Sequence, residues 1–142
     1  MECLVYKFVK GVGLSDKKIK SVVNFVLQNI NRTDSLVSVS LVGDKKIRSL
    51  NKFYRDKDMV TDVLSFATGD GKLKLTETDL GDIFICIPQI KRQAKKNNIS
   101  IKEELTRMLV HGVLHLAGFD HIKKSPAKIM FELQEKLVKE IL

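Results

Sequence analysis

The stretch SIKEELTRMLVHGVLHLAG, residues 100–118, carries the start, the apolar side and the end of one amphipathic helix. Ser100 and Glu103 form a capping box, in which each side chain accepts a hydrogen bond from the other residue's backbone N–H. Gly118 follows, and a left-handed glycine commonly ends a helix. The helix is therefore predicted to be buried along one side. That side consists of Leu105, Met108, Leu109, Gly112, Val113 and Leu116.

Upstream, predicted strands and helices alternate. Residues 3–9 and 36–42 are predicted strands, and the second alternates apolar and serine positions as a strand with one covered face does. Between them, Ser15 opens a helix. Its apolar stripe consists of Ile19, Val22, Val23, Val26, Leu27 and Ile30. After Gly43 breaks the second strand, Asp44 is predicted to cap a short helix. That helix holds Ile47, Leu50 and Tyr54.

Two further strands are predicted over residues 62–68 and 80–87. A turn at 69–71 and a polar loop over 72–79 join them. Pro88 then begins a helix that runs to about residue 97, because proline is well tolerated in the first helical turn.

A last amphipathic helix begins at Ser125 and Pro126, with Met130, Leu133, Leu137 and Ile141 on one side. The predicted order is thus strand, helix, strand, helix, strand, strand and three helices. This order indicates an α/β (α+β) fold, with a single small mixed sheet of about four strands covered by about five helices. All of residues 1–142 are predicted to form one domain.

Composition limits the class of protein. With 142 residues, of which 44% are apolar, the chain can bury a core. No apolar run reaches the ~18–20 residues of a membrane span, and the stretch MECLVYKFVK lacks the pattern of a secretory signal. Cys3 and Cys86 are too few for a disulfide scaffold, so a reduced, cytoplasmic location is expected.

The net charge of +8, from 25 basic and 17 acidic residues, has two interpretations. A polyanionic partner, either nucleic acid or an anionic surface, favours such an excess. Twenty of the basic residues are lysine, however, so a lysine-rich composition gives the same sum without any partner. Charge alone leaves both interpretations open.

All three histidines lie in HGVLHLAGFDH, residues 111–121. His111 and His115 are four residues apart on the predicted helix, which puts both imidazoles on one face. Both can then reach one ion at the ~2.0–2.1 Å typical of zinc–histidine bonds. A left-handed turn at Gly118 would fold His121 back towards them. Three imidazoles with an open position are typical of a catalytic metal site on a helix and turn. Coincidence, or histidines hydrogen-bonded within a core, is the alternative.

Three imidazoles suit a single zinc ion, although copper, nickel and iron also accept them. Asp120 is either an acceptor for an imidazole N–H or a turn residue. The spacing also matches the zinc-peptidase pattern HExxHxxGxxH, in which the glutamate is the general base. Gly112 occupies that position here, which argues against peptide hydrolysis.

These residues resemble a known family. HGVLHLAGFDH resembles the HGxLHLxGxDH signature of the YbeY family of single-metal bacterial endoribonucleases and ribosomal RNA maturation factors. LNKFYRDKDMVTDVLSF, residues 50–66, is similar to the family's LNxxYRxKDxPTDVLSF, with Val60 in place of its proline. LGDIFIC, residues 80–86, resembles the family's LGDI strand. The resemblance covers residues 36 to 121.

The resemblance implies a zinc-dependent endoribonuclease that cleaves single-stranded RNA in ribosomal RNA maturation and ribosome quality control. It implies the small ribosomal subunit as a partner and the cytoplasm as the location. His111, His115 and His121 would hold one zinc ion, with Arg55 acting near it. A guanidinium suits this role, since it can hold two oxygens of a phosphorus centre on which negative charge builds. Alternatively, Arg55 is a solvated cation at a helix end.

Two weaker candidates for substrate contact accompany Arg55. Lys57 belongs to a basic lip that could follow an RNA backbone, although any one such lysine is equally a surface residue. Ser65 lies on the strand that the resemblance places along the cleft. Two other functions stay open: an RNA-binding ribosome-assembly factor with a structural metal, and a small metallopeptidase, which Gly112 disfavours.

Overall fold

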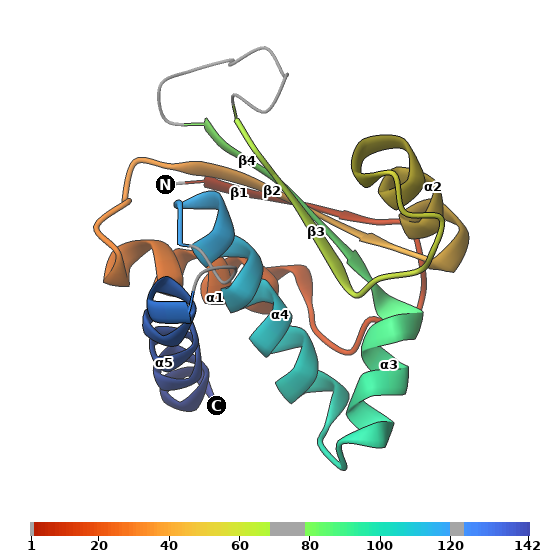
Figure 1. The fold of residues 1–142 in the computed structure, drawn as a ribbon. Coiled ribbons are helices and arrows are strands. Elements are labelled where there is room, and N and C mark those ends of the chain that lie inside the picture. The colour runs from red at the N-terminus through yellow and green to blue at the C-terminus, as the bar shows by residue number, and fades with distance from the viewer. Residues whose placement is uncertain (1, 69–78, 120–123) are drawn as a thin grey trace.

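The computed structural model describes residues 2–68, 79–119 and 124–142, and its elements follow the predicted order (Figure 1). They are β1 (Glu2–Lys7), α1 (Asp16–Asn29), β2 (Leu36–Val42), α2 (Asp44–Arg55), β3 (Val63–Ala67), β4 (Asp79–Cys86), α3 (Ile87–Lys96), α4 (Ile101–Leu116) and α5 (Lys124–Ile141). The predicted α+β class is confirmed. The predicted turn at 69–71 and most of the loop that follows lie outside the described residues.

The four strands form one mixed sheet in the order β1-β2-β4-β3. β1, β2 and β4 run parallel, and β3 pairs antiparallel with β4 at one edge. In this register Ser65 stands opposite Ile83. The residues of the edge strand β3 therefore lie beside those of β4, and α4 packs on both strands.

Helices cover both faces of the sheet (Figure 1). α1 and α4 lie against one face, where the larger core contains the alternating residues Val37, Val39 and Leu41 of β2. α2 lies against the other face, where Ile47 packs with Phe66 in a smaller core. α5 packs on α4 and thereby extends the larger core.

α4 is buried on more sides than predicted. Besides its predicted apolar side, Thr106, Val110 and Leu114 are buried, because α1, α3 and α5 all pack around the helix. At Gly112 the helix lies close to the sheet, since a Cβ there would lie 3.0 Å from Cγ2 of Ile83. A glycine at this position allows α4 to rest on β4.

The prediction that Asp44 caps α2 was wrong. The N-cap is Gly43, no side chain caps the helix, and Asp44 lies in its first turn. The Asp44 carboxylate instead accepts two hydrogen bonds from Arg92 of α3, at 2.6 and 3.1 Å. A charge-assisted, two-point contact of this kind is stronger than a hydrogen bond between neutral groups.

Tyr54 also differs from its predicted place among the apolar residues of α2. It is 52% exposed, whereas Ile47 and Asn51 are the buried residues of this helix. The ring of Tyr54 lies 4.9 Å from that of Phe66, between centroids. Tyr54 thus contacts the small core through the ring of Phe66 while remaining largely exposed.

The remaining differences concern element boundaries. β1 ends at Lys7 rather than at residue 9, and α5 begins at Lys124, one residue before the predicted start. Within the described ranges, no helix is both long enough and apolar enough to cross a membrane.

Candidate metal centre and its cleft

His111 and His115 project from the same side of α4, as their spacing predicts. Their ring centroids lie 4.9 Å apart, a separation at which two imidazoles can bind one ion. The predicted third ligand, His121, and its neighbour Asp120 lie outside the described residues. Residues 2–68, 79–119 and 124–142 contain no group of three candidate metal ligands, so the three-histidine site stays a prediction.

The end of α4 has the predicted left-handed glycine. Gly118 has φ of 96°, and its N–H donates to the oxygen of His115 at 3.0 Å. Phe119 N–H donates to the oxygen of Leu114, also at 3.0 Å. This pair of hydrogen bonds is a Schellman motif, which ends the helix directly after the histidine pair.

The polar environment of His111 suits a metal ligand. Its Nδ1 lies 2.7 Å from Oε1 of Gln134 on α5, and its ring stacks against Phe131 with centroids 6.3 Å apart. Metal-binding histidines typically use one ring nitrogen for such a hydrogen bond and the other for the metal. The described residues thus supply two imidazoles, which are ligands of a kind that zinc accepts.

The two cysteines do not complete this donor set. Neither Cys3 nor Cys86 is among the residues that line the cleft beside the histidines. Burial raises the pKa of each thiol to about 11, and Cys86 donates to the carboxylate of Asp44, at 3.2 Å between Sγ and Oδ1. Thiols with raised pKa values are poor metal ligands, because the thiolate is the binding form.

A cleft of about 670 Å³ runs beside the histidine pair. It lies between the end of α2, the segment that follows it, β3 and α4. It gathers the five predicted site residues that the structure describes: Arg55, Lys57, Ser65, His111 and His115. These five residues therefore lie along one cleft, while their functional roles stay predictions.

Arg55 is the last residue of α2, and its side chain is held on the edge strand. Nη2 donates to the backbone oxygen of Ser65 at 2.9 Å, and the guanidinium carbon lies 5.3 Å from the ring centroid of Phe66. The residue is exposed and stands at a helix end, as the alternative interpretation expects. Its anchored guanidinium also lines the cleft.

Ser65 links the two sides of the cleft. Its backbone oxygen accepts from Arg55, and its hydroxyl lies 3.4 Å from the backbone oxygen of Gly112, to which it donates. The residue therefore connects α2, β3 and α4. These contacts within the protein indicate a positioning role.

Asn51 was missed in the sequence. It is 4% exposed, and its side-chain amide donates to the backbone oxygen of Met59 at 3.0 Å. Its own backbone oxygen accepts from Lys57 N–H at 3.2 Å. Asn51 thus holds the segment that carries Lys57 against α2. The sequence did contain a signal for a buried polar contact here, because Asn51 lies four positions after Ile47 and therefore on the buried side of the helix.

Gln134 was also missed. It is 4% exposed and lies between the buried Met130 and Leu137 on α5. A polar residue within an apolar stripe must find a hydrogen-bond partner. That signal was visible, but the identity of the partner, His111, depends on how α4 and α5 pack.

The chain is similar to known proteins over most of its length. The family model described as Endoribonuclease YbeY matches residues 11–142. Among relatives named Endoribonuclease YbeY, one from Sulfurihydrogenibium sp. (strain YO3AOP1) is 38% identical over 94% of this chain and 88% of its own. Another, from Finegoldia magna, is 44% identical over 86% of this chain and 79% of its own. The solution structure of TM1509 from Thermotoga maritima has a TM-score of 0.68 and 30% identity, covering 98% of this chain and 88% of that one. The chain therefore belongs to the YbeY endoribonuclease family.

Proposed function

We propose that this chain is a zinc-dependent endoribonuclease that cleaves single-stranded RNA. The observation that carries the proposal is that one cleft holds Arg55 together with His111 and His115. Cleavage of a phosphodiester needs stabilisation of negative charge at phosphorus and a group that activates the attack. Family membership supports RNA as the substrate, because the matching relatives are named endoribonucleases.

Arg55 would bind the phosphate at the point of cleavage. A guanidinium has five N–H donors, and the contact with Ser65 O uses Nη2. The same contact fixes the orientation of the planar group before the substrate arrives. A donor that is already oriented stabilises developing charge without the cost of reorganisation.

His111 and His115 would hold a zinc ion together with His121, which we propose as the third ligand. When bound, the ion supplies Lewis acidity to a phosphoryl oxygen or to the attacking group. The histidines themselves fix the position of that charge relative to Arg55. Lys57, on the same cleft, would bind a neighbouring phosphate of the RNA backbone.

We further propose ribosomal RNA within the small ribosomal subunit as the natural substrate, and ribosome quality control in the cytoplasm as the setting. The net charge of +8 supports a polyanionic partner. Residues 1–142 would act as one metal-dependent hydrolase domain, since α5 supplies Gln134 to the histidine pair on α4.

The packing of Gly112 speaks against the metallopeptidase alternative. The glutamate of zinc peptidases would stand at this position, where even a Cβ would lie 3.0 Å from Cγ2 of Ile83. A larger side chain there would require Ile83 or α4 to move. The packing around Gly112 therefore disfavours a glutamate general base at this position.

Cleavage of a short single-stranded RNA by untagged protein, with zinc measured in the same preparation, tests the proposal. Arg55→Ala should lower kcat by about 100-fold or more while keeping its zinc, as expected for loss of one preorganised donor. His115→Ala should lose both zinc and activity yet stay folded.

Arg48→Ala is the matched control, because Arg48 lies on the same helix but pairs with Asp58 at 2.7 Å. It should retain most of the activity. Equal cleavage by all preparations would indicate a contaminating nuclease. No cleavage by wild-type protein would favour the assembly factor with a structural metal instead.

A further inference from the structure

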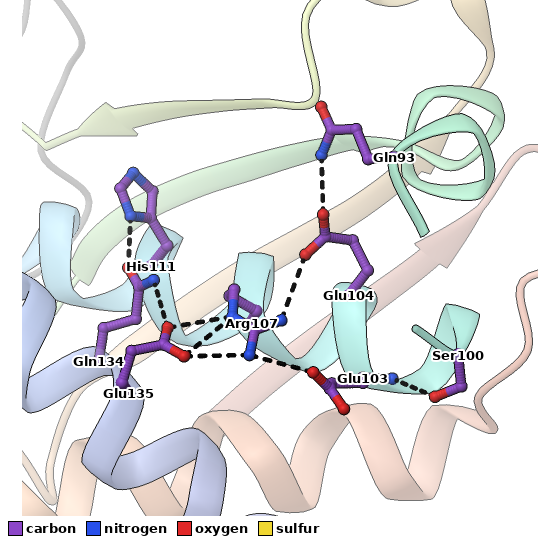
Figure 2. Close-up of polar contacts among 8 residues, drawn as sticks. All are labelled: Gln93, Ser100, Glu103, Glu104, Arg107, His111, Gln134 and Glu135. Atoms are coloured by element: carbon purple, nitrogen blue, oxygen red, sulfur yellow. Dashed lines mark hydrogen bonds and ion pairs between the residues drawn. The ribbon is translucent and has the colours of Figure 1, made fainter. Parts of the chain in front are cut away.

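His111 is connected to a chain of polar groups that runs along the contact between α4 and α5 (Figure 2). Oε1 of Gln134 lies 2.7 Å from Nδ1 of His111. The amide nitrogen of Gln134 donates to Oε2 of Glu135 at 3.0 Å. Gln134 is almost fully buried, so both ends of its amide require partners within the protein.

Arg107 anchors the far end of this chain. It lies four residues before His111, on the same side of α4. Its Nε donates to both carboxylate oxygens of Glu135, at 3.2 and 3.0 Å, and its Nη2 donates to Oε1 at 3.0 Å. The same guanidinium also contacts Glu103 at 3.2 Å and Glu104 at 3.6 Å (Figure 2). Arg107 is thereby fixed by contacts on two helices.

The charge on Glu135 decides which way the amide of Gln134 faces. Hydrogen bonding to Arg107 lowers the pKa of the Glu135 carboxyl below its ordinary value, so the group is ionised at neutral pH. An ionised carboxylate only accepts hydrogen bonds. The NH₂ end of Gln134 must therefore face Glu135, and its oxygen must face His111.

The orientation of Gln134 in turn decides where the proton of His111 lies. An amide oxygen only accepts, so the Nδ1 atom that faces it must carry the hydrogen. In a neutral imidazole the other nitrogen, Nε2, then carries the lone pair. The tautomer of a histidine is set in this way by the hydrogen bond that one ring nitrogen makes.

We propose that Arg107, Glu135 and Gln134 are positioning residues that hold neutral His111 with its proton on Nδ1 and its lone pair on Nε2. The inference rests on the proposed function in one respect: it makes Nε2 the atom with which His111 would bind zinc. The stacking of Phe131 on the ring of His111, with planes inclined by 26°, restricts the same imidazole in rotation.

Long-range ¹H–¹⁵N correlation NMR of the full-length, metal-free protein, at a pH where histidine is neutral, reads the tautomer directly. Wild-type His111 should show a protonated Nδ1. Gln134→Leu removes the acceptor, and Glu135→Gln removes the charge that orients the amide. In both variants the Nε2-protonated form should appear.

Glu132→Gln is the matched control. It makes the same chemical change on the same helix, at a residue whose ion pair with Lys128 spans 3.9 Å. It should leave the tautomer of His111 unchanged. Circular dichroism verifies that each variant is folded, and Glu135→Gln keeps the test decisive if Gln134→Leu does not fold.

Zinc titration against a competing chelator adds a readout that does not depend on cleavage. Removing the hydrogen-bond partner of a metal ligand typically weakens metal binding ~10–100-fold. We expect a decrease in zinc affinity of this size for Gln134→Leu and a smaller decrease for Glu135→Gln. A protonated Nε2 in wild-type protein, or a tautomer that neither variant alters, would overturn the proposal. If the variants alter the tautomer but wild-type protein binds no zinc, the positioning role stands and the proposed function fails.

Discussion

The guanidinium of Arg55 and the backbone oxygen of Ser65 are joined by a 2.9 Å hydrogen bond that fastens the end of α2 to the edge strand β3. The hydroxyl of Ser65 continues the connection to the backbone of Gly112 on α4. The position of Arg55 thus depends on the same strand that contacts the helix bearing the histidines. This relationship explains how a residue at the end of a helix becomes part of the cleft.

Replacing Arg55 by lysine should lower RNA cleavage, although the charge is kept. An ammonium is a point charge without the planar fork that binds two oxygens, and it cannot reproduce the contact with Ser65 in the same geometry. We expect a loss smaller than the roughly 100–1,000-fold typical of removing a preorganised donor altogether. Steady-state kcat and zinc content are the measurements, with Arg48→Lys as the control. Wild-type rates in Arg55→Lys would show that charge alone suffices.

Gly112→Ala should destabilise the protein, even though alanine favours helix. The new Cβ would lie 3.0 and 3.1 Å from Cγ2 and Cδ1 of Ile83, which is too close without movement of that side chain. Overpacking of this kind costs about 1–3 kcal/mol, against a gain of roughly 1 kcal/mol in helix propensity. Urea unfolding should therefore show a net loss of free energy of unfolding.

Combining Gly112→Ala with Ile83→Val should cost less than the sum of the two single substitutions, because valine lacks the Cδ1 atom that would lie 3.1 Å from the new Cβ. Ile83→Val alone is expected to cost about 0.5–1.5 kcal/mol. A double-mutant cycle separates the two effects. Simple additivity of the two substitutions would show that Gly112 and Ile83 do not compete for the same space.

Asn51→Ala should loosen the segment that carries Lys57. The substitution removes the 3.0 Å bond to the backbone oxygen of Met59, and loss of a typical intramolecular hydrogen bond costs about 0.5–1.5 kcal/mol. Both the free energy of unfolding and the affinity for RNA should fall. Asn29→Ala is the control, because it removes a similar bond, to Phe25 O at 2.8 Å, on an exposed surface of α1. Equal effects of the two substitutions would contradict the role given to Asn51.

Glu135 should make stability depend on pH in the acid range. Its folded pKa is lowered by Arg107, so its contribution is fully present above its ordinary value of 4.5 and is lost as the pH falls through the lower folded value. The side chain is about half exposed, which limits the contribution to about 1 kcal/mol or less. Wild type should therefore be more stable than Glu135→Gln at neutral pH, and the difference should vanish in acid. A constant difference at all pH values would be inconsistent with this linkage.

Local signals in the sequence predicted the elements well. Ser15 and Ser100 were recognised as helix starts, and each hydroxyl accepts the expected backbone N–H, at 3.1 and 3.0 Å. Gly118 was recognised as a helix end, and its positive φ confirms it. Helix caps and helix-ending glycines depend on contacts within a few residues of the chain, so they can be predicted without knowledge of the fold.

The contacts that complete the cleft are not local. Gln134 meets His111 across 23 positions of the chain, and Arg55 meets Ser65 only because β3 returns beside α2. Periodicity indicated that α4 has an apolar side, but not that α5 would cover its opposite side. The spacing of the histidines predicted a metal site and the resemblance pointed to Arg55, whereas the polar chain through Arg107 required the packed helices.

Removing the metal should leave the fold intact, because α4 is held by apolar packing rather than by its histidines. Leu109 and Val113 are completely buried, while His111 and His115 border the cleft. Chelation should therefore leave the far-ultraviolet circular dichroism of the protein unchanged. Bound zinc should raise the free energy of unfolding only by mass action, about 2.7 kcal/mol at a free concentration 100 times its Kd. Loss of helical signal on chelation would mean instead that the metal is structural, and the assembly-factor interpretation would then be favoured over the nuclease.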